Sequence, residues 1–461
     1  MFAGFDYGTS NCALGVIVDA AGRDTSGRTK LLNIDGQHAF MPSALYALER
    51  ELICESVAQN IADKTKRQTY IEQRRNLLVR ARNVRSEHGI ASSEQSLFTG
   101  RSAFDQYIAD PSEGYFIKSP KSFLGASGLR PESVAFFEDI VCAMMQTIKQ
   151  RGEVSSQREI SQVVIGRPVN FQGIHAEKSN KQAIDILRQA AERAGFTSVE
   201  FLYEPLAAGM DFETRLTSDK TVLVVDVGGG TTDCSMVRMG PGHCQRFERQ
   251  QDFLGHSGER IGGNDLDIQL TAKALMPLFG MESLLKNGLR MPTQHFWNAA
   301  KTNDLGAQTT FNSLACELSL KQLLVDSREP ELLQRFIKLR RDQQNHHLVR
   351  SAEQCKIALS EHSSHSTSLD YIEAGLSSEV SQQQLANAID GPINKIVSLM
   401  QDAMQQAGCQ PQLIYVTGGS AKSPLIHAAI ERQLGAIEVV DGDHFGSVAA
   451  GLSVWAEKIF R

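Results

Sequence analysis

Two short segments of this chain share the same unusual order of residues. Residues 1–18 read MFAGFDYGTSNCALGVIV, and residues 221–237 read TVLVVDVGGGTTDCSMV. In each segment an apolar run leads into an aspartate, a turn of Gly, Thr and Ser follows, and a second apolar run leads out. The apolar runs predict strands, so each segment is expected to form a hairpin with its aspartate beside the turn. A chain that carries this hairpin twice is expected to have two related lobes whose turns face each other across a cleft.

The two turns have the composition of a polyphosphate site. Gly8 and the glycines at 228–230 can adopt a positive φ without a Cβ clash, and successive N–H groups can then line one concavity that binds anions. Asp6 and Asp226 would repel a phosphate, but they become useful when Mg²⁺ lies between, because that ion prefers carboxylates and water. One such turn alone is equally well explained as an ordinary hairpin loop. Two matching copies favour a protein that handles ATP.

Other nucleotide signatures are missing from the sequence. It contains no G-x-x-x-x-G-K-[ST] pattern and no strand-led G-x-G-x-x-G pattern, which argues against a P-loop protein and a dinucleotide-binding domain. A third glycine turn, at residues 418–422, follows a strand-like run and begins a helix. It is compatible with the backbone approaching a flat ligand such as an adenosine, and equally with a plain strand-to-helix turn.

Length and composition narrow the class of protein. At 461 residues the chain is expected to form about three domains or lobes. Its net charge of −6 offers no overall attraction to nucleic acid or to an anionic membrane, and no apolar run predicts a membrane span or a signal peptide. The 8 cysteines include no Cys-x-x-Cys pair, which favours reduced thiols in the cytoplasm.

Residues 64–85 are densely basic, with Glu72 as their only acid. We interpret them as the solvent-exposed face of a helix whose Ile71, Leu78 and Ala81 point inward. We prefer this interpretation to a binding patch for an acidic partner or nucleic acid. The basic residues are Lys64, Lys66, Arg67, Arg74, Arg75, Arg80, Arg82 and Arg85.

Strand-like and helix-like patterns alternate along the rest of the chain. Helices are expected at about 131–150, 176–195 and 348–360. Residues 162–171 are expected to contain a short buried strand that ends at Pro168, and residues 413–426 a strand, a glycine turn and the start of a helix. The stretches 50–112 and 265–345 are expected to be largely helical. Such alternation is typical of an α/β architecture.

At this point the residues resemble a known family. DYGTSN, EPLAAG, DVGGGTTD, GGNDLD and TGGSAKSP occur in the order found in the actin-like ATPase superfamily. MPS at 41–43, KSFLG at 121–125, IGRPVNF at 165–171 and RSAEQCKIALS at 350–360 are most similar to its heat-shock 70-kilodalton chaperone branch. The resemblance implies an α/β, two-lobed actin-like ATPase fold, made of duplicated ribonuclease-H-like domains with helical inserts.

The resemblance also implies domain boundaries. Lobe I would comprise residues 1–216 and 443–461, with a peripheral subdomain at about 42–118. Lobe II would comprise residues 217–442, with a peripheral subdomain at about 257–367. Family members usually continue into an apolar linker, a β-rich peptide-binding domain and a helical lid, and no C-terminal peptide-binding domain is expected here.

Carried over position by position, the family assigns roles to residues of this chain. Asp6 and Asp226 would hold hydrated Mg²⁺, and Lys121, Glu204, Asp226 and Thr231 would serve catalysis, with Lys121 at the γ-phosphate. The remaining residues implied in nucleotide binding are Gly8, Thr9, Ser10, Asn11, Gly228, Gly229, Gly230, Gly262, Gly263, Glu353, Lys356, Ser360, Gly418, Gly419, Ser420, Lys422 and Asp443. The implied cofactors are ATP or ADP and Mg²⁺, with K⁺ as a further candidate ion.

The function implied is that of a chaperone-like, Mg-dependent ATPase whose lobes close on nucleotide. A small-molecule kinase of the same superfamily is the alternative, although no cleft carboxylate stands out as its base. An actin-like filament subunit ranks below both. A protein partner or client is expected, nucleic acid and membrane are not, and a monomer is the default.

The chain departs from the family pattern at particular positions. Lys422 stands where the family often has arginine, so stacking on a base would be weaker. Residues 171–177, FQGIHAE, lack an arginine that usually follows the strand bearing the family's proline, here Pro168. These departures, with the expected absence of a peptide-binding domain, bear on peptide refolding rather than on nucleotide binding.

Overall fold

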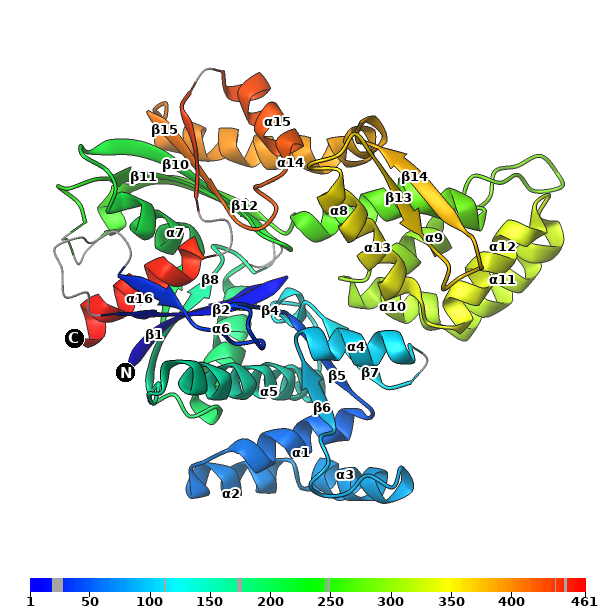
Figure 1. The fold of residues 1–461 in the computed structure, drawn as a ribbon, viewed down its shortest axis with the longest axis horizontal. Coiled ribbons are helices and arrows are strands. Elements are labelled where there is room, and N and C mark those ends of the chain that lie inside the picture. Colours follow the sequence, from blue (N-terminus) through cyan, green and yellow to red (C-terminus); the bar gives the residue numbers. More distant parts are fainter. Residues whose placement is uncertain are drawn as a thin grey trace.

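The computed structural model describes the chain except for residues 19–27, 112, 172–175, 245, 247–248, 436 and 443–445. Its described part forms two lobes, each built around one large sheet, with a peripheral extension on each lobe (Figure 1). Within these residues no helix is both long enough and apolar enough to cross a bilayer.

The first lobe contains a mixed sheet in the order β3-β2-β1-β8-β9, with β4 also paired to β2. The hairpin predicted at the N-terminus forms β1 and β2, and β1 pairs in parallel with β8. The strands are β1 (Phe2–Tyr7), β2 (Asn11–Ile17), β3 (Thr29–Leu31), β4 (Phe40–Pro42), β8 (Gln162–Arg167) and β9 (Ser198–Tyr203).

The second lobe repeats this pattern in the order β12-β11-β10-β15-β16. The second predicted hairpin forms β10 and β11, and β10 pairs in parallel with β15 as β1 does with β8. The strands are β10 (Lys220–Val227), β11 (Thr232–Met239), β12 (Phe253–Glu259), β15 (Leu413–Thr417) and β16 (Val439–Asp441). The repeated order confirms the predicted two-lobed actin-like ATPase fold.

Strand alternation places the two aspartates on equivalent faces. Ala3, Phe5 and Tyr7 of β1 belong to a core that also contains residues of α5 (Pro131–Ser156) and α6 (Ala176–Arg193). In β10, Leu223, Val225 and Val227 point likewise into the outer core of the second lobe. Because successive strand residues alternate sides, Asp6 and Asp226 fall on the inner faces, between the two sheets.

Two helices fill the space between the sheets (Figure 1). They are α7 (Glu204–Glu213) and α16 (Ser447–Phe460), and their apolar side chains share one core with β10 and β15. The helices approach closely because Gly451 has no side chain: a Cβ there would lie 1.7 Å from the carbonyl oxygen of Ala207. This packing joins the lobes at the end of the molecule where both termini lie.

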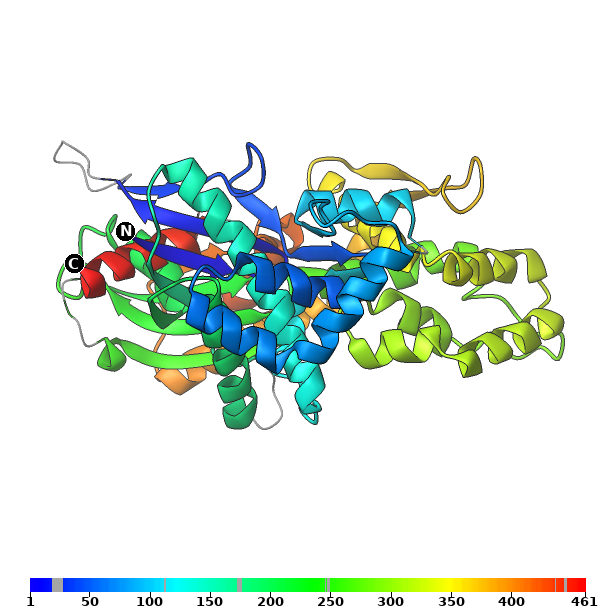
Figure 2. The same cartoon turned by 90° about the horizontal axis from the view of Figure 1, so that it is seen from below.

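The peripheral part of the first lobe is helical on its outer side. A three-stranded sheet, in the order β6-β5-β7, connects it to the main sheet. Seen from below, α1, α2 and α3 lie in front of the rest of that lobe (Figure 2). The elements are β5 (Ala44–Ala47), α1 (Arg50–Asn60), α2 (Lys64–Gln73), α3 (Arg75–Glu87), β6 (Leu97–Thr99), α4 (Arg101–Ala109), β7 (Tyr115–Lys118) and the 3₁₀ turn η1 (Pro120–Phe123).

The second lobe carries a longer helical extension. It begins with α8 (Gly263–Leu270), the π-helical turn η3 (Thr271–Leu275) and the 3₁₀ turn η4 (Met276–Phe279). It continues with α9 (Gln294–Ala300), α10 (Leu305–Asn312), α11 (Leu314–Asp326), α12 (Pro330–Arg341) and α13 (Asn345–Ala358), and with the hairpin β13 (Ser364–Ser368) and β14 (Ser377–Ser381). Helices α14 (Gln382–Ala407) and α15 (Pro424–Leu434) return to the main sheet.

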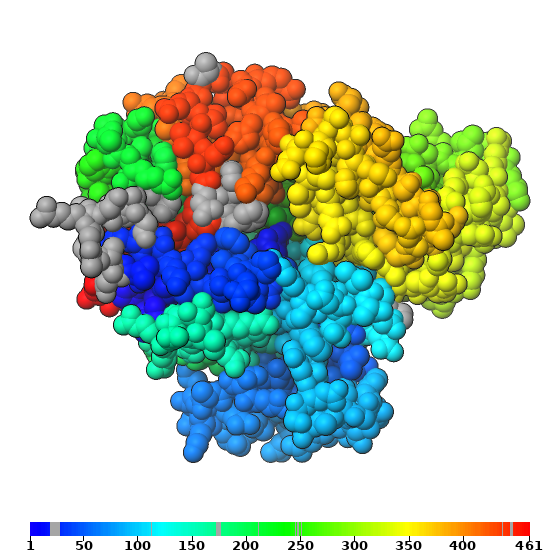
Figure 3. Space-filling model, viewed as in Figure 1, coloured from blue at the N-terminus to red at the C-terminus, as the bar shows by residue number. Residues whose placement is uncertain are grey.

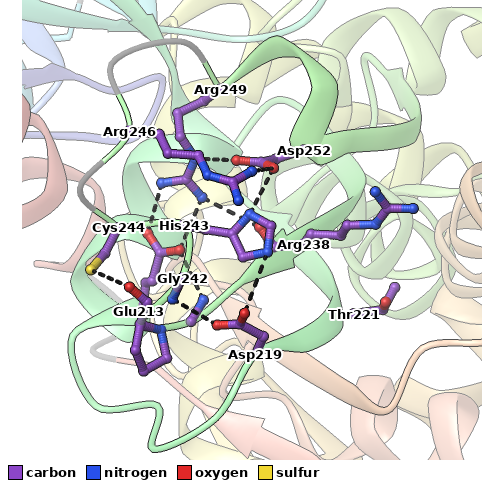
Figure 4. A network of polar contacts seen from close by, with 12 residues as sticks. Glu213, Asp219, Thr221, Arg238, Gly242, His243, Cys244, Arg246, Arg249 and Asp252 are labelled. Atoms are coloured by element: carbon purple, nitrogen blue, oxygen red, sulfur yellow. Dashed lines mark hydrogen bonds and ion pairs between the residues drawn. The ribbon is translucent and has the colours of Figure 1, made fainter.

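A buried ion network supports the second lobe where the β11–β12 connection meets α7 (Figure 4). Arg249 donates hydrogen bonds to both oxygens of Glu213, at 2.8 and 3.0 Å, and to Asp252 at 2.6 Å. Asp252, in the 3₁₀ turn η2 (Gln250–Asp252), also pairs with His243, 2.7 Å from Nδ1. The side chains of Arg249 and Glu213 are 3% and 2% exposed, so each charge depends on its partner.

Candidate active site

A cavity of about 970 Å³ lies between the lobes, and the two hairpin turns form part of its wall. The first turn contributes Gly8 to Asn11, and the second contributes Gly228, Gly229 and Thr231. Helices α8, α13 and α15, the third glycine turn and the start of α16 contribute further wall residues. The structure therefore brings the segments singled out in the sequence to one concave surface.

The hairpin turns touch each other, and glycine makes this contact possible. A Cβ on Gly229 would lie 1.7 Å from Ser10 Oγ, and one on Gly230 would lie 2.5 Å from Thr9 Cγ2. The sequence suggested a positive φ at these glycines, but neither Gly8 nor any of Gly228–Gly230 has one. In the third turn Gly418 does have a φ of 91°. The tight approach of the lobes, rather than a left-handed backbone, explains the glycines of the hairpins.

The surroundings of Asp6 and Asp226 disfavour the charged form of both carboxyl groups. Burial, followed by the charge of Glu204, raises the pKa of Asp226 to about 8. Burial and Glu204 likewise raise the pKa of Asp6 to about 8, with a further contribution from Asp226. Carboxyl groups held in this way gain a large benefit from a nearby cation.

Lys121 and Glu204 form a buried ion pair behind these aspartates. Lys121 follows Pro120 in η1 and donates a hydrogen bond to Glu204 Oε1. Glu204 is the first residue of α7, where a negative charge suits the helix dipole. Burial alone would lower the pKa of Lys121, but Glu204 and then Asp6 raise it overall, so the lysine is charged.

The pair of aspartates fits a divalent ion that keeps other ligands. Among the described residues no group of three or more His, Cys, Asp or Glu side chains is arranged to hold a metal. A hard cation at Asp6 and Asp226 would therefore need water and phosphate oxygens to complete its shell, as Mg²⁺ at nucleotide sites commonly does. The excess of carboxylate over cationic charge at this point agrees with such an ion.

The cavity wall also contains other residues implied in nucleotide binding. They are Glu353, Lys356 and Ser360, in α13 and just after it, and Gly418, Gly419, Ser420 and Lys422 of the third glycine turn. Lys356 Nζ lies 2.6 Å from Asp267 Oδ1, which fixes the lysine against α8. Glu353 Oε2 accepts a hydrogen bond of 3.3 Å from Lys118, a residue of the first lobe.

Some predicted residues lie off the cavity wall. Of the described residues, Gly263 belongs to the lining, whereas Lys121, Gly230 and Gly262 do not. Lys121 is 5% exposed and faces Glu204, and Gly262 packs with its Cα against the backbone of Gly228 and Gly229. Asp443 lies outside the described residues, and Asp441 lines the cavity nearby in the chain.

Among the residues that had no predicted role, three make polar contacts that support the site. Asn264 contacts both Ser10 and Ser119, each at 3.4 Å, and so bridges the lobes. Asp267 anchors Lys356, and Asp233 accepts a hydrogen bond of 3.0 Å from the backbone N–H of Val169, just after Pro168. All three belong to the GGNDLD and DVGGGTTD segments, so the polar residues that close those segments were the available signal.

Part of the chain is similar to known proteins. The model of the Hsp70 protein family matches residues 131–283, a stretch that includes Glu204, the second hairpin and α8. The chaperone protein HscA homolog of Acinetobacter baylyi is 33% identical over 150 residues, which are 32% of this chain and 22% of that protein. The HscA homolog of Acinetobacter baumannii is 32% identical over 174 residues, or 37% of this chain and 25% of that protein. Over residues 131–283, this chain is therefore similar to the Hsp70 family.

The match to the Hsp70 model includes the second hairpin, whereas the first hairpin lies outside residues 131–283. The matched segments span no more than a quarter of these two HscA homologs, 22% and 25% of their lengths. The reaction, its ion and its protein partners require a separate argument.

Proposed function

We propose that this chain binds and hydrolyses ATP with Mg²⁺ and couples the nucleotide to the positions of its lobes. The observation that carries the proposal is the pair of matched hairpin turns, which place Asp6 and Asp226 on the inner faces of two repeated sheets and line one cavity. Backbone N–H groups and hydroxyls of both turns would hold the phosphates. A chaperone-like role follows from the family and would involve a protein client.

In this proposal the residues of the site have separate roles in hydrolysis. Asp6 and Asp226 would hold Mg²⁺, which when bound offsets charge on the β- and γ-phosphate oxygens. Lys121, kept charged by Glu204, would exchange that partner for the γ-phosphate, since in this structure it does not line the cavity. Thr231, on the cavity wall, would lie beside the leaving phosphate. K⁺ would be an additional ion at the phosphates.

Lobe closure is part of the proposal. We place the boundary between α7 and β10, so that residues 1–216 with 443–461 form one lobe and residues 217–442 form the other. On the visible face, cyan residues of α4 and β7 meet yellow residues of α13 (Figure 3). Tyr107 Oη donates a hydrogen bond of 2.5 Å to the backbone oxygen of Gln343 at this junction. A nucleotide that contacts both lobes would favour this closed arrangement.

Phosphate release from ATP in buffer with Mg²⁺ tests the proposal. Asp226→Asn should abolish release while leaving the fold intact, because the isosteric amide cannot supply the negative charge that the ion needs. Asp185→Asn is the matched control, since Asp185 is an exposed residue of α6 whose side chain pairs with Lys181. Unchanged release in Asp226→Asn would refute the assignment. Turnover that begins only when a hydroxyl acceptor is added would favour the small-molecule kinase instead.

The cysteines are compatible with the cytoplasmic location that we propose. Each of the 8 cysteines is a free thiol in the structure, and most are buried. Reduced thiols are typical of proteins in reducing compartments.

A further inference from the structure

Helices α2 and α3 lie on the outside of the first lobe (Figure 2). They carry a group of exposed cations. We call this group the basic strip, and it consists of Lys64, Lys66, Arg67, Arg75, Arg80 and Arg82. The inward side of the helices agrees with the sequence-based interpretation, because Ala81 is buried and Ile71 and Leu78 are half-buried. The structure thus separates a packing face from an outer face that bears the charge.

Two arginines of the same segment have a structural role and are not part of the strip. Arg74 pairs with Asp139, 3.0 Å from Nε to Oδ2, and Arg85 pairs with Glu55 at 2.6 Å. The strip residues differ, because among the described residues none of them forms an ion pair with an acidic side chain, and only Lys66 donates a side-chain hydrogen bond, to the backbone oxygen of Glu192. Exposed lysines elsewhere do find acids, as Lys181 does with Asp185 and Lys321 with Glu317.

The strip is placed where it does not help its own helices. Lys64, Lys66 and Arg67 occupy the start of α2, and Arg75 begins α3, while neither helix has an acid in its first turn. Cations at the N-terminal end of a helix oppose the helix dipole. Asp63 caps α2 through the backbone N–H of Lys66, but its carboxylate forms no ion pair with the side chains of the strip in the described structure. Since neither ion pairs nor the helix dipole favour the four cations at the helix starts, their charge is better explained by something outside the chain.

A hollow of about 430 Å³ adjoins the strip at the junction of α2 and α3. Its wall combines apolar residues at the start of α5 and just before it with the polar residues Gln73, Arg74, Glu138, Gln189 and Arg193. Glu138 pairs with both arginines, at 3.3 Å from Arg74 and 2.9 Å from Arg193. The apolar residues are Leu129, Pro131, Val134 and Ala135. Lys66 reaches the oxygen of Glu192, the neighbour of Arg193, so strip and hollow lie next to each other.

We propose that the basic strip and this hollow bind an acidic segment of a partner protein. Acidic side chains of the segment would lie along α2 and α3, and one apolar side chain would enter the hollow. Charge complementarity favours an acidic partner. The hollow adds shape complementarity, which makes the binding more specific than electrostatic attraction alone. The site lies on the peripheral part of the first lobe, away from the nucleotide cavity, so it does not depend on the proposed ATPase activity.

Nucleic acid fits this surface less well. The only aromatic residue of α2 and α3, Tyr70, is 1% exposed, so no exposed ring on these helices could stack on a base. Exposed acids, Glu72 and Glu87, interrupt the cations, and the whole chain has a net charge of −6. A protein segment with spaced acids matches this mixed pattern better than a continuous phosphate backbone does.

Fluorescence polarisation with a fluorescein-labelled, glutamate-rich peptide that carries one central leucine tests the proposal. The full chain should bind this peptide at low salt, and the variant R67Q/R75Q/R82Q should bind it about tenfold more weakly or worse. The matched control K181Q/K321Q/R341Q removes the same number of exposed positive charges elsewhere and should bind like the wild type. Equal weakening by both sets would overturn the strip as a specific site.

A second arm tests the hollow and the competing ligand. Replacing the leucine of the peptide by serine should weaken binding to the wild type about threefold, and Ala135→Gln, which fills the hollow, should remove that difference. An unchanged difference in Ala135→Gln would reject the hollow as the anchor. Single-stranded oligothymidylate should bind more weakly than the peptide at matched salt, and tighter binding would replace the acidic segment with nucleic acid. Unaltered circular dichroism and thermal midpoint verify that each variant is folded.

Discussion

Lys118 of β7 and Glu353 of α13 form an ion pair across the cleft, with 3.3 Å between Nζ and Oε2. Glu353 also lines the cavity, among the residues implied in nucleotide binding. Burial would raise the pKa of Glu353, but Lys118, Lys356 and Arg350 lower it overall, so the carboxylate is held charged. One side chain therefore takes part both in the contact between lobes and in the proposed nucleotide site.

Removing Lys118 should speed the release of nucleotide. Lys118→Ala breaks a partly buried ion pair between lobes, so we expect the dissociation rate of a fluorescent ADP analogue to rise roughly three- to tenfold. Stopped-flow displacement measures this rate. Lys181→Ala, which removes an exposed ion pair on α6, serves as the control and should leave the rate unchanged. An unaltered dissociation rate in Lys118→Ala would show that this ion pair does not control lobe opening.

Lys121 should have separable effects on stability and on hydrolysis. Lys121→Met leaves Glu204 buried without its partner, and breaking such a pair typically costs roughly 3–5 kcal/mol. The double variant Lys121→Met/Glu204→Gln removes both charges, so most of that stability should return. Hydrolysis should stay absent in both variants because the γ-phosphate lacks its lysine. Denaturant unfolding and phosphate release measure the two properties, and recovery of turnover in the double variant would rule out the catalytic role.

The contact between lobes should weaken in mild acid through His346. Burial, and then the charge of Lys118, lowers the pKa of His346 to about 3, and its buried Nδ1 has no hydrogen-bond partner in the described structure. Below the ordinary histidine pKa of about 6.5 the unfolded chain binds a proton that the folded chain does not, so stability falls as pH falls. The slope is about 1.4 kcal/mol per pH unit for one proton.

Unfolding curves for the wild type and His346→Gln between pH 7.5 and 5.5 test this contribution. The variant has no titrating group at this position and should lose less stability over that interval, by about 1 kcal/mol. Parallel pH profiles for the two proteins would show that another group controls the acid response.

The ion network around Asp252 allows a buried arginine and an exposed arginine to be compared within one cluster (Figure 4). Arg249→Met leaves Glu213 and Asp252 buried without their shared cation, and we expect a loss of roughly 3–5 kcal/mol in unfolding free energy. Arg246 contacts the same Asp252 at 3.4 Å, but its side chain is 55% exposed. Arg246→Met should therefore cost much less, under about 1 kcal/mol. Equal costs would mean that burial does not determine the strength of this network.

The sequence predicted the parts of the fold that depend on local pattern. Strand and helix periodicity predicted the hairpins with Asp6 and Asp226, the helix that begins at Pro131 and the amphipathic helix at 348–360. Helix α5 continues to Ser156, beyond the expected end at 150, until Gln157 adopts a φ of 55°.

Contacts between distant segments could not be predicted in the same way. Two such contacts are the ion pair of Lys118 with Glu353 and the hydrogen bonds of Asn264 with Ser10 and Ser119. Sequence periodicity does not predict them, because each depends on how the lobes meet. The same holds for the glycines of the hairpins: their composition indicated a turn, but only the packing of the lobes showed that a side chain would collide. Lys121 was singled out through the family, and its partner Glu204 became evident only in the fold.

Gly229 provides the sharpest test of the closed arrangement. Gly229→Ala would place a Cβ 1.7 Å from Ser10 Oγ, so the hairpin turns must move apart. We expect the affinity for ADP, measured by calorimetry, to fall about tenfold or more, because the two phosphate-binding turns no longer fit one ligand. Ser10→Gly in the same chain removes the colliding hydroxyl and should restore part of the affinity. Gly391→Ala is the matched control, since a Cβ there meets no atom within 4 Å and alanine favours the helix α14. If Gly229→Ala bound ADP as tightly as Gly391→Ala, contact between the turns would not be required for nucleotide binding.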